Sequence, residues 1–151
     1  MTGLRTSAIT AAVVVSLAAL GLAGCGAEDR TKVAAPSATT LPECAPSATP
    51  VALPEAFPER FPLPRGAVVR EGRDDGSTIN VEALIPGEIR DVAESLLDGL
   101  PPAGFELGEG DSEEHEAESH FTGNGFAGFF KLNTVGGCDG ANTLAVVLTR
   151  S

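Results

Sequence analysis

The stretch "HFTGNGFAGFFKL", residues 120–132, carries the clearest structural signal in this chain of 151 residues. Apolar and small side chains stand on both sides of Gly123-Asn124-Gly125, and an Asn-Gly pair in that setting is typical of a tight β-hairpin turn. We therefore predict that residues 114–121 and 126–132 form two antiparallel strands. Their alternation directs one face inward, made of Ala117, Ser119, Phe121, Phe126, Gly128, Phe130 and Leu132.

An earlier segment predicts a second hairpin followed by a helix. Residues 68–71 and 79–84 flank Asp74-Asp75-Gly76-Ser77, a sequence that favours a turn. Apolar residues then recur at helical spacing over residues 89–100, and Pro101-Pro102 ends the pattern. A helix with one such apolar stripe normally covers a sheet, which we favour over a stripe that binds a partner.

The remaining strands complete the predicted sheet. Phe105 and Leu107 begin a strand, residues 108–111 resemble a turn, and residues 142–150 ("NTLAVVLTR") form the last strand. Two strands, one helix and about four more strands follow one another without strand–helix alternation. This order predicts an α+β fold, in which a single antiparallel sheet of about five to six strands carries one amphipathic helix on one face.

The amino terminus predicts export. An apolar run of about 16 residues, 8–23, follows the single basic side chain of Arg5, and it is short for a helix that crosses roughly 30 Å of hydrocarbon. A secretory signal is therefore favoured over an anchoring helix. The run ends in Leu22-Ala23-Gly24-Cys25, which resembles the lipobox of bacterial lipoproteins. The resemblance implies that residues 1–24 are a signal peptide and that Cys25 carries a diacylglyceryl group.

Two acyl chains hold a protein stably on a membrane, so the expected location is the outer face of the bacterial plasma membrane. Removal of Arg5 with the signal leaves 9 of the 10 Lys and Arg side chains against 21 Asp and Glu. A chain this acidic offers no basic face for phosphate groups, which argues against nucleic acid as a partner. Arg, Ala, Gly and Pro are abundant, as a GC-rich actinobacterial genome would encode.

The segment behind Cys25 is rich in Ala, Pro, Ser and Thr. Such a composition buries too little apolar surface to fold, so residues 25–54 are predicted to be a lipidated tether and residues 55–151 the domain. The proline-rich stretch "LPEAFPERFPLPRG", residues 53–66, is here named the lead-in. Its apolar side chains are expected to dock on the domain.

One of the three cysteines is expected to carry the lipid, and the other two are expected to pair with each other. With Cys25 acylated, Cys44 and Cys138 remain, and in an oxidising compartment a disulfide between them is the simplest outcome. Two free thiols or an intermolecular bridge are the alternatives. Cys138 lies in "GGCDGANTL", which with "FPLPRGA", "LPPAGFEL" and "HFTGNG" resembles a group of small actinobacterial lipoproteins whose domain has no established activity. These motifs consist mostly of turn and strand-end residues, so the resemblance implies a fold and no catalytic residue.

Two features are candidate sites. Glu116, Glu118 and His120 share one face of a predicted strand, about 6 to 7 Å apart, and carboxylates with an imidazole suit several divalent cations. The favoured alternative is a solvated edge whose like charges prevent aggregation. Phe129 faces away from Phe130; it is either covered by the lead-in, which we favour, or an exposed recognition residue.

Motifs for catalysis are missing from the sequence. It contains no G-x-S-x-G elbow, no H-E-x-x-H pair and no glycine-rich phosphate loop after a strand. The expected function is therefore non-enzymatic and without cofactor: a domain that binds a protein or other envelope component while its lipid holds it to the membrane. The alternative is a carrier of a small ligand or divalent metal that uses Glu116, Glu118 and His120.

Overall fold

The hairpin predicted around the Gly-Asn-Gly turn is confirmed. In the computed structural model, which describes residues 40–151, Gly123 lies opposite Phe126 and the two strands pair in register away from the turn. Asn124 and Gly125 have φ of 52° and 81°. Left-handed backbone at both central positions is the geometry that lets a two-residue turn follow the twist of its strands. The signal peptide and Cys25 lie outside the described residues.

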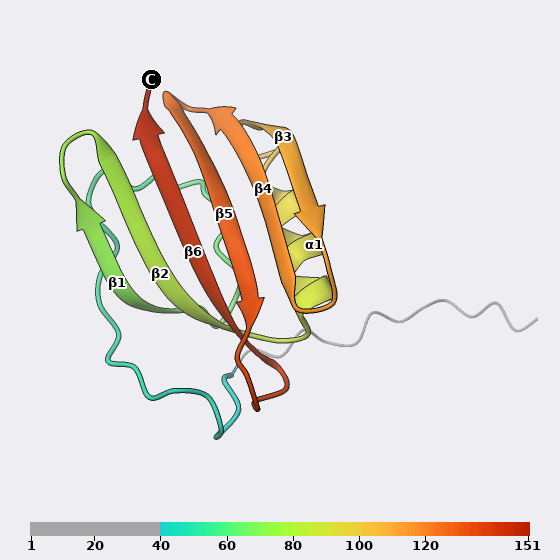
Figure 1. The fold of residues 1–151 in the computed structure, drawn as a ribbon. Coiled ribbons are helices and arrows are strands. Elements are labelled where there is room, and N and C mark those ends of the chain that lie inside the picture. The colour runs from blue at the N-terminus through green and yellow to red at the C-terminus, as the bar shows by residue number, and fades with distance from the viewer. Residues whose placement is uncertain (1–39) are drawn as a thin grey trace, which may run out of the picture. The chain divides into compact units, whose positions relative to one another are not determined.

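Six strands form one antiparallel sheet with a helix on one face, which confirms the α+β prediction (Figure 1). The strand order is β1-β2-β6-β5-β4-β3. The bounds of the elements are β1 Val68–Asp74, β2 Thr78–Pro86, α1 Ile89–Gly99, β3 Phe105–Ser112, β4 Glu116–Gly123, β5 Phe126–Thr134 and β6 Ala141–Arg150.

The turn between β1 and β2 is held by aspartates. One carboxylate oxygen of Asp75 accepts hydrogen bonds from the backbone N–H groups of Ser77 at 3.0 Å and Thr78 at 2.8 Å. A carboxylate that accepts bonds from its own following backbone replaces the hydrogen bonds that the turn leaves open. At the same end of the sheet, Arg150 of β6 donates to both oxygens of Asp74, at 2.8 and 3.1 Å.

The prediction of a turn at residues 108–111 is wrong, because β3 continues through them to Ser112 and the chain reverses at residues 113–115. The glycines there serve strand pairing. The register shifts between Leu107 and Gly110, which marks a bulge. A Cβ at Gly110 would stand 2.6 Å from the carbonyl oxygen of Glu118, so glycine permits the close approach of β4.

The core lies between the sheet and two covering segments, α1 and the lead-in. From α1, the side chains of Val92, Ala93 and Leu96 are buried. From the lead-in, Phe57 and Phe61 are each 6% exposed, which confirms that its apolar side chains dock on the domain. The inward positions predicted on β4 and β5 all belong to this side of the sheet, and those with large apolar side chains are buried or packed against the core.

Aromatic rings connect the lead-in to the sheet. The ring of Phe61 lies with its centroid 6.0 Å from that of Phe105 and 5.8 Å from that of Phe121. Phe105 and Phe121 are themselves 5.3 Å apart in an edge-to-face arrangement. Pro62 packs on the end of α1, where a Cβ at Gly99 would lie 2.6 Å from the Cβ of the proline. The lead-in is thus part of the core.

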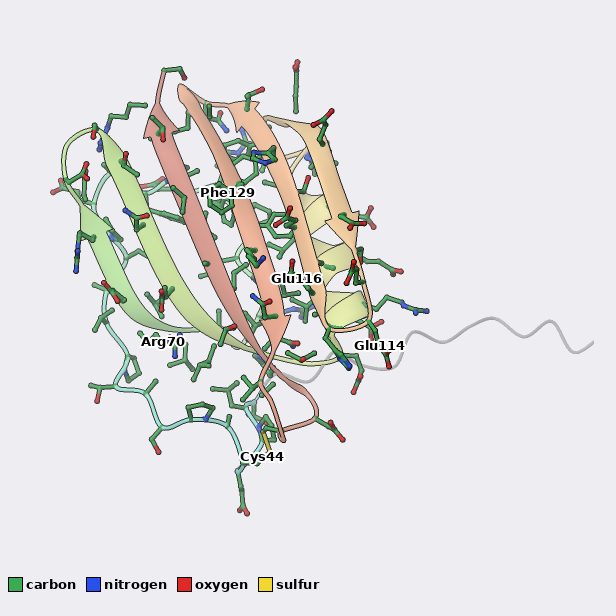
Figure 2. The ribbon with its side chains drawn as sticks, in the orientation of Figure 1. Cys44, Arg70, Glu114, Glu116 and Phe129 are labelled. Atoms are coloured by element: carbon green, nitrogen blue, oxygen red, sulfur yellow. A yellow bond between two sulfur atoms is a disulfide. The ribbon has the colours of Figure 1, made fainter. Side chains whose placement is uncertain are left out.

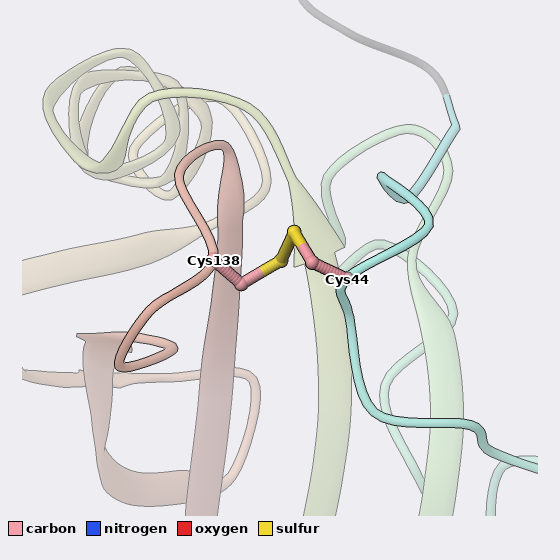
Figure 3. The surroundings of a disulfide bond; sticks show 2 residues. All are labelled: Cys44 and Cys138. Atoms are coloured by element: carbon pink, nitrogen blue, oxygen red, sulfur yellow. A yellow bond between two sulfur atoms is a disulfide. The ribbon is translucent and has the colours of Figure 1, made fainter.

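The structure contains the predicted bridge between Cys44 and Cys138, with Cα atoms 5.4 Å apart (Figure 3). Cys138 is buried in the loop between β5 and β6, whereas Cys44 is exposed. The bridge joins positions 94 residues apart in sequence. It therefore fixes the segment that precedes the lead-in to the end of the sheet.

Candidate binding face of the sheet

The side of the sheet opposite α1 and the lead-in carries a second set of side chains, which we call the open face. Figure 1 shows α1 behind the sheet, so that the open face is turned toward the viewer. The members named next are exposed or partly exposed, whereas Leu84, which alternation also places on this side of β2, is buried and is not counted among them. They are Asn80 and Glu82 on β2, Ala145, Val147 and Thr149 on β6, Ala127, Phe129 and Lys131 on β5, and Glu116, Glu118, His120 and Thr122 on β4.

Phe129 occupies the centre of the open face. In register it lies opposite His120 of β4 and Val147 of β6. The rings of Phe129 and His120 have centroids 5.7 Å apart and are tilted by 50°. Around them is a shallow hollow of about 280 Å³, which Ala127 and Thr149 also line. Small neighbours leave the aromatic ring only partly covered, so it is available for contact.

The interpretation that the lead-in covers Phe129 is wrong. The lead-in packs on the other side of the sheet, where Phe57 and Phe61 join the core and lie within 5.3 Å of each other. The rings of Phe105 and Phe121 contact Phe61 of the lead-in, whereas the open face has only the single ring of Phe129. Phe129 therefore belongs to the open face, as the alternative of an exposed residue requires.

Lys131 organises the acidic part of the open face, on which Figure 2 labels Glu116. Its Nζ lies 2.8 Å from Oε1 of Glu116 and 3.7 Å from Oε2 of Glu118. The hydrogen bond to Glu116 is the chief reason that the pKa of Lys131 is raised above its ordinary value. All three side chains keep about two fifths of their surface exposed, so solvent screens the attraction between them.

The predicted metal ligands Glu116, Glu118 and His120 do not form a ligand set. Among residues 40–151, no group of three or more His, Cys, Asp or Glu side chains is placed to hold a metal ion. Two contacts explain this: Lys131 pairs with both carboxylates, while the imidazole of His120 lies against Phe129. The metal-binding form of the carrier hypothesis therefore has no ligand set among residues 40–151.

The role of Lys131 was missed in the sequence although the signal was present. A two-residue turn pairs Gly123 with Phe126, and counting back along both strands places Lys131 opposite Glu118. Opposite charges directly across two antiparallel strands attract each other. The electrostatics of Glu116 and Glu118 therefore depend on the neighbouring strand as well as on their own.

A second ion pair stands on the β1 side of the open face. Nη2 of Arg70 lies 3.0 Å from Oε2 of Glu82. The open face therefore has an aromatic and aliphatic centre that lies between two partly exposed ion pairs. A central apolar anchor with a polar rim is the usual composition of a surface that binds another macromolecule.

A larger hollow of about 550 Å³ lies at the end of the sheet, between the start of α1 and the loop that holds Cys138. Four glycines contribute to its walls, and its titratable side chains are Glu88, Glu114, His115 and Asp139. Glu114 and His115 belong to the turn between β3 and β4 rather than to a strand. Within the described residues these groups do not converge on a metal-binding geometry.

The conspicuous sequence motifs form connections between segments. Asn124 in "HFTGNG" donates from Nδ2 to the carbonyl oxygen of Ala103 in "LPPAGFEL", at 3.1 Å. Asn142 in "GGCDGANTL" is buried and donates to the carbonyl oxygen of Gly87, at 2.7 Å. These asparagines bind hairpin turns and loops to their neighbours, which is a structural role.

Searches against protein-family models, curated proteins and solved structures found no match to this chain. Over residues 40–151, no helix combines the length and the hydropathy needed to cross a membrane.

Proposed function

We propose that this chain is an extracytoplasmic bacterial lipoprotein, held at the outer face of the plasma membrane by a lipid on Cys25. Its domain acts by binding a protein or another envelope component and not by catalysis. The observation that carries the binding role is Phe129, a partly exposed aromatic at the centre of an uncovered sheet face.

The proposed anchor is supported by two features. Leu22-Ala23-Gly24-Cys25 stands directly behind a short apolar run, the position of a lipobox. The bridge between Cys44 and Cys138 is a kind of bond that forms and persists outside the reducing cytosol. With those two cysteines paired, Cys25 is the one left for acylation.

The binding role is supported by the way the phenylalanines are distributed. Phe129 is the one phenylalanine that points away from the core, and aromatic side chains are enriched at the centre of surfaces that bind other proteins. Its neighbours Val147 and Ala127 extend the apolar centre. The ion pairs beyond them supply the polar rim of a contact surface.

Mass analysis of the mature amino terminus tests the anchor. Protein recovered from membranes of the native host is expected to begin at Cys25 and to carry the added mass of a diacylglyceryl group. A Cys25→Ser variant serves as the control and should be neither acylated nor cleaved at this position. A mature chain with an unmodified Cys25 would contradict the proposal.

Site-specific photocrosslinking tests the open face. A benzoyl-phenylalanine in place of Phe129 is expected to capture a discrete adduct in intact cells. The same photoreactive residue in place of Val51, which is 44% exposed and lies outside the open face, is the matched control. Recovery of the monomer alone from position 129, or the same adducts from both positions, would remove the support for binding through this face.

A further inference from the structure

The two edges of the sheet differ in how they are protected. At the β1 edge the backbone N–H of Val51 donates to the carbonyl oxygen of Val69 at 2.9 Å. A Cβ at Gly72 would lie 2.9 Å from Cδ of Pro54, so residues 51–54 lie along this strand. The chain therefore covers its own β1 edge.

The β3 edge has no comparable cover within the described chain. From Glu106 to Ser112, the backbone hydrogen bonds that β3 makes to other elements of residues 40–151 go to β4 alone. Figure 1 shows β3 as the outermost strand, with α1 on the same side of the molecule. An uncovered strand edge presents a row of N–H and C=O groups that can pair with another extended chain.

Beside this edge lies an apolar groove. Leu97 of α1 and Leu107 of β3 line a hollow of about 330 Å³, whose floor includes the backbone of Gly108 and Gly110. Leu107 pairs in register with the buried Phe121, yet it is 42% exposed because the covering segments do not extend over it. The groove can accept one apolar side chain of a segment that pairs with β3.

The elements that frame the groove are acidic. α1 carries three carboxylates and one guanidinium, that of Arg90, whereas β3 carries three carboxylates and no basic side chain. Within residues 40–151, none of these six carboxylates has an ion-pair partner. They are Asp91, Glu94, Asp98, Glu106, Glu109 and Asp111. The groove thus favours a basic ligand and repels an acidic one.

We propose that the β3 edge accepts an extended, basic segment of another protein as a seventh strand. Main-chain hydrogen bonds join it to β3, an apolar side chain enters the groove between Leu97 and Leu107, and Lys or Arg side chains face the carboxylates. A second copy of this chain is a poor occupant, because two acidic β3 edges would repel each other. This surface is separate from Phe129, so the inference goes beyond the open face.

Acidic side chains and a bulge also serve to prevent edge-to-edge aggregation, and the test distinguishes this role from strand addition. The probe is a fluorescein-labelled octapeptide of alternating Val and Lys, titrated with the full chain in detergent micelles and followed by anisotropy. We expect saturable binding, with slowed amide exchange in β3. An octapeptide of alternating Val and Glu should not bind.

A backbone-modified peptide and one pair of variants separate strand addition from simple charge attraction. N-methylation of every second residue on one edge of the Val-Lys peptide should abolish binding, since the charges are kept and the main-chain donors are lost. Leu107→Asp should weaken binding about tenfold, the effect of losing one buried apolar contact. Leu53→Asp, the same change at a leucine that is 38% exposed and outside the edge, should not.

Two further variants decide the remaining outcomes. Glu109→Lys with Asp111→Lys, both exposed positions, should lower the affinity for the Val-Lys peptide even if Leu107→Asp disturbs the fold. Phe129→Ala should leave the affinity unchanged, so this test and that of the open face fail independently. Equal binding of the N-methylated peptide, equal effects of Leu107→Asp and Leu53→Asp, or no binding at all would overturn the proposal.

Discussion

The two faces of the sheet differ most clearly at Phe129 and Phe130, which are consecutive residues of β5. The ring of Phe130 is fully buried among core side chains, and that of Phe129 lies partly exposed beside His120. Of the seven phenylalanines in the chain, six belong to the core side: Phe57, Phe61, Phe105, Phe121, Phe126 and Phe130. One strand thus supplies core packing on one face and, in our proposal, a contact residue on the other.

The largest expected effect is on the covered face. Phe130→Ala should lower the free energy of unfolding by about 3 to 5 kcal/mol, the usual range for a buried phenylalanine whose removal leaves a cavity. Denaturant unfolding followed by circular dichroism measures it, provided that the m-value is unchanged. A loss below about 1 kcal/mol would mean that the covered face does not form the main core.

The disulfide is the next largest contribution. Cys44→Ser with Cys138→Ser should cost about 2 to 4 kcal/mol, because the bridge closes a loop of 94 residues in the unfolded chain. Comparison of the double variant with the oxidised protein by denaturant unfolding measures the loss. Equal stability of the two proteins would show that the lead-in stays on the covered face without this attachment.

The parts of the fold that could be predicted from sequence are those with local causes. The Gly-Asn-Gly turn, the Asp-Asp-Gly-Ser turn and the helical stripe ending at Pro101 each specify their own conformation. Alternation then predicted that Phe121 and Phe130 point inward, and both are buried. Each of these signals acts within a few residues of the chain. The tertiary contacts favour the same conformations, so the local predictions hold.

What could not be predicted depends on contacts between distant segments. The glycines at 108 and 110 favour a turn locally, and only the presence of β4 beside them makes them part of a bulged strand. In the same way, nothing within the lead-in specifies which face of the sheet it covers. The rings of Phe105 and Phe121 decide this, because they extend an apolar surface that Phe61 completes.

Phe129→Ala should show the contrast with Phe130 directly. We expect a loss of less than about 1 kcal/mol in unfolding free energy, since the ring is partly exposed and no cavity forms in the core. The same unfolding experiment serves both variants. A loss as large as that for Phe130→Ala would mean that the ring of Phe129 is structural, and the open face would lose its candidate anchor.

Acid should destabilise the turn between β1 and β2 more than it destabilises either face of the sheet. Arg150 lowers the pKa of Asp74 below its ordinary value of 3.8, and the backbone N–H of Thr78 is the main cause of the lowered pKa of Asp75. Because folding depresses these values, the stabilisation is complete well above pH 3.8 and is lost as the pH falls through 3.8 and below.

Unfolding free energies measured between pH 6 and pH 2.5 test this sign. Asp74→Asn should reduce the slope over the acidic part of that range, and it should have its largest effect on stability near neutral pH, where Asp74 of the parent is ionised. The effect is small because Asp74 and Arg150 keep about a third of their side-chain surface exposed. Identical slopes of unfolding free energy against pH for the variant and the parent protein would contradict the predicted role of Asp74.

The smallest expected effect concerns divalent cations and the open face. Zn²⁺, Mn²⁺ or Ca²⁺ at millimolar concentration should leave the melting temperature unchanged, because binding to the folded state alone would raise it. Lys131 already neutralises part of the charge of Glu116 and Glu118, and a cation would have to displace its ammonium group. A rise that disappears in the variant with Glu116→Gln and Glu118→Gln would restore the metal site. The absence of any rise would leave the proposed contact through Phe129 as the remaining candidate role of this face.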